Sequence, residues 1–200
     1  MMPIGVMAAL LTLVQPELIE RTLALVGGQA ITLSDARAAL ALGLVESPTG
    51  GDPIASATTA LVDRELVLRE VQRYAPPAPS ETVVETRLDE IRKRVPAPDA
   101  LAQLLRAHGF TQARLRAWVR DDLRTEAYLA QRFASASLPS DTDISAAYNR
   151  QRAEFEKAGQ SFEQAAPIVR ERLIASRRAE LLADWLSELR RRTDVVILAQ

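Results

Sequence analysis

The residues that could carry out chemistry are few in this sequence. His108 is the one histidine, and it precedes Gly109 at the expected end of a helix. No nearby serine or acidic residue is arranged with it as a partner in proton transfer. Cysteine is absent, which excludes disulfides, thiol catalysis and cysteine ligands for a metal. A catalytic triad or a histidine metal cluster could therefore have at most one member.

The remaining polar patterns do not define a catalytic or cofactor site either. Acidic residues are plentiful, but they lie among arginines on predicted helix faces, so no carboxylate pair stands out. Gly27-Gly28 lacks the GxGxxG spacing of a dinucleotide-binding loop and precedes a predicted strand instead of a helix. A P-loop is also absent from the sequence. We therefore expect no catalytic residues, no cofactor and no bound metal, and a protein that is not an enzyme.

The charge balance argues against nucleic acid as a partner. The formal net charge is −1, which gives no electrostatic excess for nucleic acid or for an anionic membrane surface. One segment, residues 101–119, resembles a helix-turn-helix, with Arg114 and Arg116 on its second helix. The apolar pattern of that helix continues past Leu123, well beyond the length of a recognition helix. We expect no nucleic-acid partner.

The first fourteen residues contain no charged side chain. They are too few to span a bilayer as a helix. Their length, and the small residues Ala8 and Ala9, match the apolar region of a secretory signal, although the positively charged start of such a signal is missing. We predict that residues 1–16 are a signal peptide or an apolar N-terminal tail, that the protein is periplasmic or secreted, and that it has no integral membrane span.

The stretch Ala60–Tyr74 is predicted to form the central helix of the fold. Its apolar residues cover more than half of the helix circumference, so the helix needs neighbours on several sides. The helix is expected to begin near Ser56 or Ala57 and to end at the proline-rich segment 75–79. Its apolar residues are Leu61, Val62, Leu66, Val67, Leu68 and Val71.

The two ends of the chain are predicted to meet in one small sheet. Residues 21–32 form a hairpin pattern in which Gly27-Gly28 supplies the positive φ angles of a tight turn. A lone hairpin is only marginally stable in water, so it needs a third strand. The other β-branched run of the chain is Val195–Leu198, near the C-terminus. This pairing would make residues 17–200 a single, mainly helical domain closed by its terminal strands.

Capping residues and breakers predict the other helices. Proline at position 167 predicts either a kink or a late start near Ile168 for the last of them. Six helices are predicted in this way. Four of them begin directly after a capping residue: after Thr32, ending near Leu44; after Ser80, ending at Val95; after Thr111, ending at Phe133; and after Ser140, continuing through Phe155. The other two span Asp99–His108 and Ile168–Arg192.

The order of these elements resembles the core of the SurA-type periplasmic chaperones. The resemblance covers nearly everything after Glu17, and no single motif in it is specific. It depends on the ordered set of four stretches, which are Leu25–Asp35, Ala60–Arg73, Thr111–Phe133 and Phe162–Leu198.

The resemblance implies an ATP-independent holdase that binds unfolded secreted or outer-membrane proteins. Members of the family commonly carry parvulin-type prolyl isomerase domains, inserted after the helix that here ends near Phe155. Only Glu-Lys-Ala-Gly-Gln-Ser separates Phe155 from Phe162, which is too short for a domain. We therefore expect no prolyl isomerase activity. The sequence does not determine the oligomeric state.

A holdase needs apolar side chains that remain accessible in a cleft. The candidate client-binding residues are aromatic, and for each of them taken alone the sequence favours a place in the core, since a core aromatic and a cleft aromatic have the same sequence pattern. An alternative function is a non-catalytic helical adaptor that binds one specific envelope partner. The candidates are Trp118, Tyr128, Phe133, Tyr148 and Phe155.

Overall fold

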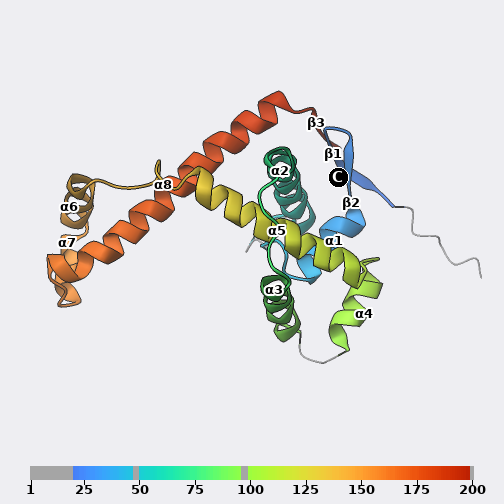
Figure 1. The fold of residues 1–200 in the computed structure, drawn as a ribbon, viewed down its shortest axis with the longest axis horizontal. Coiled ribbons are helices and arrows are strands. Elements are labelled where there is room, and N and C mark those ends of the chain that lie inside the picture. Colours follow the sequence, from blue (N-terminus) through green and yellow to red (C-terminus); the bar gives the residue numbers. More distant parts are fainter. Residues whose placement is uncertain (1–19, 47–49, 96–98, 199–200) are drawn as a thin grey trace, which may run out of the picture.

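A computed structural model describes residues 20–46, 50–95 and 99–198. The predicted signal peptide or tail, residues 1–16, lies outside this part of the chain. Within it the fold is mainly helical, with eight helices and one antiparallel sheet of three strands, as the sequence predicts. Figure 1 shows a helical core beside the sheet, and a long arm that projects from the core.

The sheet joins the two ends of the described chain. Its strand order is β2-β1-β3, with β1 (Thr22–Val26) in the centre between β2 (Gln29–Thr32) and β3 (Val195–Ile197). The hairpin turn has φ angles of 53° at Gly27 and 86° at Gly28, which only glycine adopts without strain. The predicted pairing of the terminal strands is therefore confirmed.

Helix α2 (Pro53–Tyr74) is the centre of the core. All six apolar residues predicted to be buried in it are buried. The helix begins earlier than Ser56, because Asp52 accepts a hydrogen bond from the backbone N–H of Ile54 at 2.9 Å. Pro53 then occupies the first helical position, where the missing N–H costs nothing. The predicted start was wrong because Asp52-Pro53 looked like part of the preceding loop.

Four further helices pack with α2 and the sheet around one hydrophobic core. Each begins near its predicted cap, and Thr32, Ser80 and Thr111 each accept a backbone hydrogen bond there. The first ends three residues before Leu44, ahead of Gly43, whose φ is 62°. The four are α1 (Leu33–Ala41), α3 (Glu81–Lys93), α4 (Ala100–Ala107) and α5 (Gln112–Arg132).

Helix α8 (Phe162–Arg192) belongs to two packed bodies. Its C-terminal half covers the core, while its N-terminal half carries α6 (Asp141–Arg150) and α7 (Arg152–Lys157) at the end of the arm (Figure 1). Among the described residues, neither hydrophobic cluster includes a side chain between positions 173 and 181 of α8. The buried part of the arm cluster is Ile144, Ala147, Phe155, Ala165 and Val169.

The late start near Ile168, one of the two outcomes that Pro167 allowed, is not found. The last helix begins at Phe162, directly after Ser161, whose backbone N–H donates to the side chain of Gln164 at 2.9 Å. Pro167 lies within the helix, where its ring removes one backbone donor without ending the helix. The helix after Ser140 does not continue to Phe155, because it breaks at Gln151. In a straight helix, rings seven residues apart would be separated by about 10 Å. The break allows Phe155 to stack on Tyr148 with the ring centres 5.5 Å apart.

The start of the arm is held by the predicted capping box. The backbone N–H of Ser140 donates to Asp143 at 2.9 Å, and the N–H of Asp143 donates to the Ser140 hydroxyl at 3.1 Å. Arg177 of α8 forms an ion pair with Asp143 at 2.9 Å and donates to the carbonyl of Leu138 at 2.9 Å. These contacts attach the segment that enters the arm to α8.

The carboxyl of Asp143 is expected to titrate with a pKa of about 2, because the Ser140 hydrogen bonds, and then Arg177, favour its charged form. Since this pKa lies below the ordinary 3.8, the charged Asp143 stabilises the folded state above pH 3.8, and this contribution is lost as the pH falls towards 2. NMR titration of the carboxyl carbon measures this pKa directly. Ser140→Ala should move the midpoint up towards 3.8, and a wild-type midpoint near 3.8 would contradict the cap.

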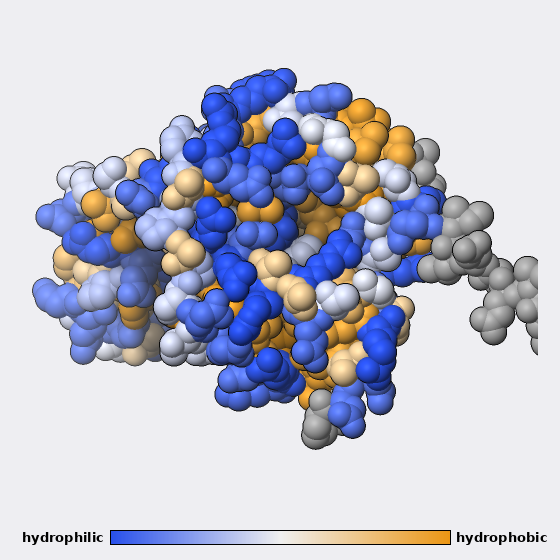
Figure 2. Space-filling model, turned by 45° about the vertical axis from the view of Figure 1, so that its right-hand side comes forward, coloured by the Kyte–Doolittle hydropathy of each residue, from blue (hydrophilic) through white to orange (hydrophobic). Residues whose placement is uncertain are grey.

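The molecular surface is largely hydrophilic in the view of Figure 2, with hydrophobic residues gathered at the end of the molecule formed by the sheet. None of the helices in the described residues has a stretch that is long and apolar enough to cross a membrane.

Candidate functional site

A groove with an apolar floor lies where the core meets α8. It has a volume of about 580 Å³. Five parts of the chain line it, namely the helices α2, α3, α5 and α8 and the short segment that follows α1. Most of its apolar residues are only partly buried, so their side chains are available to a bound group. The apolar lining consists of Leu44, Val45, Ala60, Val67, Leu129, Leu182 and Leu186.

Four of the six charged residues that line the groove form two ion pairs with one another. Arg64 donates to Asp122 at 2.9 Å and its guanidinium lies 3.7 Å from the centre of the Trp118 ring. Arg87 forms two hydrogen bonds with Glu126, at 2.9 and 3.1 Å. These two pairs keep this part of the rim hydrophilic while each charge in them is compensated by its partner.

Burial raises the pKa of the Asp122 carboxyl, and the neighbouring Arg64 opposes this rise. Burial also raises the pKa of Glu65, again opposed by nearby arginines, Arg69 and Arg64. Both shifts are explained by partial burial beside arginine, as in a structural ion pair. They do not by themselves indicate an acid–base site, since neither carboxyl faces a nucleophile or a histidine in the described residues.

Three of the predicted client-binding aromatics are core residues in this structure. Trp118 lies beneath Arg64, while Tyr128 and Phe133 pack around Trp185 of α8, with ring centres 6.1 and 6.0 Å from it. All three are buried, each at most 9% exposed, so none of them offers a surface to a client in this conformation. The contacts of Tyr128 and Phe133 with Trp185 instead attach α8 to the core and so position one wall of the groove.

The other two predicted aromatics lie together in the arm. Phe155 is buried, and Tyr148 is partly buried between it and Phe162, whose ring lies edge-on to Tyr148 at 5.1 Å. Phe162 is 38% exposed, which makes it the most accessible aromatic ring of the arm. The sequence reasoning did not include Phe162, because it follows the cap Ser161 directly and belongs to no apolar stripe.

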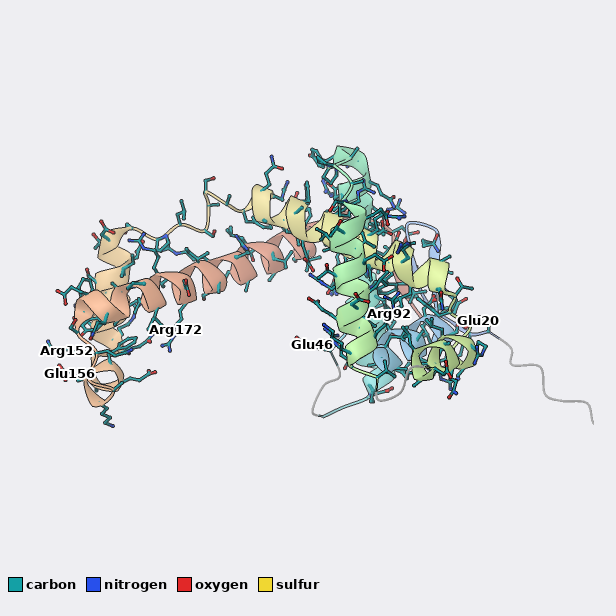
Figure 3. All side chains as sticks on the ribbon, turned by 60° about the horizontal axis from the view of Figure 1, so that its bottom comes forward. Glu20, Glu46, Arg92, Arg152, Glu156 and Arg172 are labelled. Carbon is teal, nitrogen blue, oxygen red and sulfur yellow. The ribbon has the colours of Figure 1, made fainter. Side chains whose placement is uncertain are left out.

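The end of the arm is covered by charged residues. Arg152 and Glu156 of α7 form an ion pair at 2.7 Å, and Arg172 of α8 donates to Gln151 at 3.0 Å. Figure 3 shows these charged side chains at the end of the arm, away from the core, and Glu46 on the side of the core that faces the arm. The aromatic cluster of the arm is therefore bordered by polar groups, as the groove is.

No catalytic arrangement is formed around His108 in the described chain. Its backbone N–H donates to the carbonyl of Leu104 at 3.2 Å as α4 ends, which is the helix-terminal position predicted for it. Within residues 20–46, 50–95 and 99–198, no group of three histidine or acidic side chains is placed to hold a metal ion.

No known family model matches the sequence, and no curated protein is similar to it. The resemblance to the SurA-type chaperones therefore stays a prediction from the order of the elements.

Proposed function

We propose that the protein is an ATP-independent holdase chaperone that binds unfolded secreted or outer-membrane proteins in the groove between its core and α8. The observation that carries this proposal is the apolar groove itself, about 580 Å³ in volume and bordered by paired charges. A surface of this kind binds apolar segments while the surrounding charges keep the free protein soluble.

The shape of the molecule supports transient binding of a flexible chain. The groove lies at the base of the arm, and the arm carries a second group of accessible apolar side chains, Tyr148 and Phe162. A polypeptide that contacts both places would be held at two weak sites, and the linkage would raise its overall affinity. The same geometry gives no reason to expect prolyl isomerase activity.

The test is suppression of aggregation. The protein is mixed with several unrelated unfolded proteins, including an unfolded outer-membrane protein, and light scattering is followed without ATP. Suppression of all of them is expected for a holdase. A single tight stoichiometric partner, with no effect on the others, would instead indicate the adaptor function.

Val45→Asp is expected to weaken aggregation suppression several-fold, because it places a charge on the apolar floor of the groove. Val45 is only partly buried at the edge of the core and lies outside regular helix, so the helices should persist, and circular dichroism of the variant checks this. Val83→Asp is the matched control, since Val83 is 47% exposed near the start of α3, where an acidic residue suits the helix. Equal suppression by the two variants would contradict binding in the groove.

A further inference from the structure

Among the residues that the structure describes, no strand pairs with the outer edge of β3. In the β1–β3 pairing, Leu25 lies opposite Val196, and the N–H of Leu198 donates to the carbonyl of Leu23 at 2.9 Å. Antiparallel pairing alternates between residues that bond to the neighbour and residues that face away. The backbone N–H and C=O groups of Val195 and Ile197 therefore point away from β1.

No hydrogen bond from any part of the chain that the structure describes reaches these four backbone groups. Natural sheet edges are normally protected by short strand length, charges, proline, a bulge or a covering element, and β3 has the first of these, since it is only three residues long. The strand Val195–Ile197 has no charged residue and no proline. Its side chains are also apolar and accessible, with Val196 41% and Ile197 54% exposed, and the hydrophobic surface beside the sheet is visible in Figure 2.

We propose that the free edge of β3 binds an extended segment of an unfolded polypeptide as a fourth strand of the sheet. Only an extended backbone satisfies two outward N–H and two outward C=O groups on one strand. The exposed side chains of Val196 and Ile197 favour a segment with β-branched or aromatic residues at alternate positions. The proposal rests on the holdase function and assigns it a site for the client's backbone, separate from the groove.

The length of the edge favours a client over a second copy of the chain. A strand of three residues buries far less surface than the roughly 1,600 Å² of a standard stable interface, so strand pairing alone would not hold a dimer. Two of the nearby arginines already have acidic partners, since Arg190 pairs with Asp63 at 2.6 Å and Arg192 with Glu70 at 2.9 Å. A weak, uncharged strand site suits transient capture of apolar segments.

The direct test uses two labelled peptides with the same alternating valine and threonine residues. One peptide is methylated on every second backbone nitrogen, which removes the donors on one edge and leaves the side chains almost unchanged. Fluorescence anisotropy with the full chain measures the affinity of each. The unmodified peptide is expected to bind about tenfold more tightly or better, because each lost hydrogen bond weakens the pairing. Equal binding of the two peptides would overturn the proposal.

Ile197→Pro tests the same edge from the side of the protein. Proline removes the outward N–H of residue 197, which makes no bond to β1, so the sheet should persist. Ile197→Thr is the matched control, because it also removes the large apolar side chain but keeps the N–H. Peptide affinity is expected to fall at least fivefold further in the proline variant than in the threonine variant. Similar affinities would overturn the proposal, and if the proline variant does not fold, the methylated peptide still decides.

The outcomes for the edge and for the holdase function are distinguishable. Loss of peptide binding in Ile197→Pro, with binding retained in Val45→Asp, supports the strand site. Aggregation suppression without any peptide binding would overturn the edge proposal and leave the holdase function in place. A change of oligomeric state in Ile197→Pro, measured by sedimentation, would assign the edge to a second copy and would also overturn it.

Discussion

Replacing Trp185 by alanine is expected to lower the free energy of unfolding by about 3–5 kcal/mol. Trp185 is 5% exposed, and it is the residue of α8 that contacts both Tyr128 and Phe133 of the core. The guanidinium of Arg132 also lies 4.6 Å from the centre of its ring. The substitution leaves a large cavity among these side chains at the point where α8 attaches to the core, and a rigid cluster of this kind cannot collapse to fill it.

Urea unfolding followed by circular dichroism measures this loss. Trp185→Phe is the control, because it keeps an aromatic ring in the cluster and should lower the free energy of unfolding by much less. The groove should suffer as well, since Leu182 and Leu186 of the same helix form one of its walls. A loss below about 1 kcal/mol in Trp185→Ala would show that this contact does not hold α8 to the core.

The sequence was sufficient to predict those features of the fold that depend on local signals or on simple physical constraints. The capping residues Thr32, Ser80 and Thr111 predicted helix starts correctly, because a cap acts on its own first turn. The pairing of Val195–Ile197 with the hairpin followed from the need of a lone hairpin for a third strand. The wide apolar surface of α2 predicted a central position because such a helix is stable only when it is surrounded.

The candidate site was less predictable, because it depends on how distant segments pack together. The groove is formed by residues from five parts of the chain, and most of them belong to ordinary apolar helix stripes. A stripe that faces the core and a stripe that faces a groove have the same spacing, so Leu182 could not be separated from Leu189. For the same reason Trp118, Tyr128 and Phe133 were candidates although they are buried.

The arm was mispredicted for a different physical reason. The break at Gln151 carries no proline or glycine, so no local signal marks it. The stacking of Tyr148 on Phe155 and the packing of both against α8 stabilise the break through tertiary contacts. Pro167 left the start of α8 open in the sequence, because a proline either delays a helix or lies within one. The strong start at Ser161 allows α8 to contain the proline at the loss of one backbone bond.

Replacing Phe155 by alanine is expected to unfold the arm and to leave the core folded. Replacing a buried phenylalanine by alanine lowers the free energy of unfolding by about 3–5 kcal/mol. Phe155 is 3% exposed and is the largest side chain of an arm cluster with only five buried members in the described chain. The remaining four side chains are small or aliphatic, so they are not expected to hold α6 and α7 against α8 without it. The core has its own separate cluster and does not depend on Phe155.

Native-state hydrogen exchange separates the two parts of the molecule. In Phe155→Ala, the backbone amides of α6 and α7 should exchange as in an unfolded chain, while those of α2 keep their protection. Phe162→Ala is the matched control, because Phe162 is 38% exposed at the edge of the same cluster, and it should cause only a small loss of protection in the arm. Equal loss of protection in α2 and in the arm would show that the two clusters unfold as one unit.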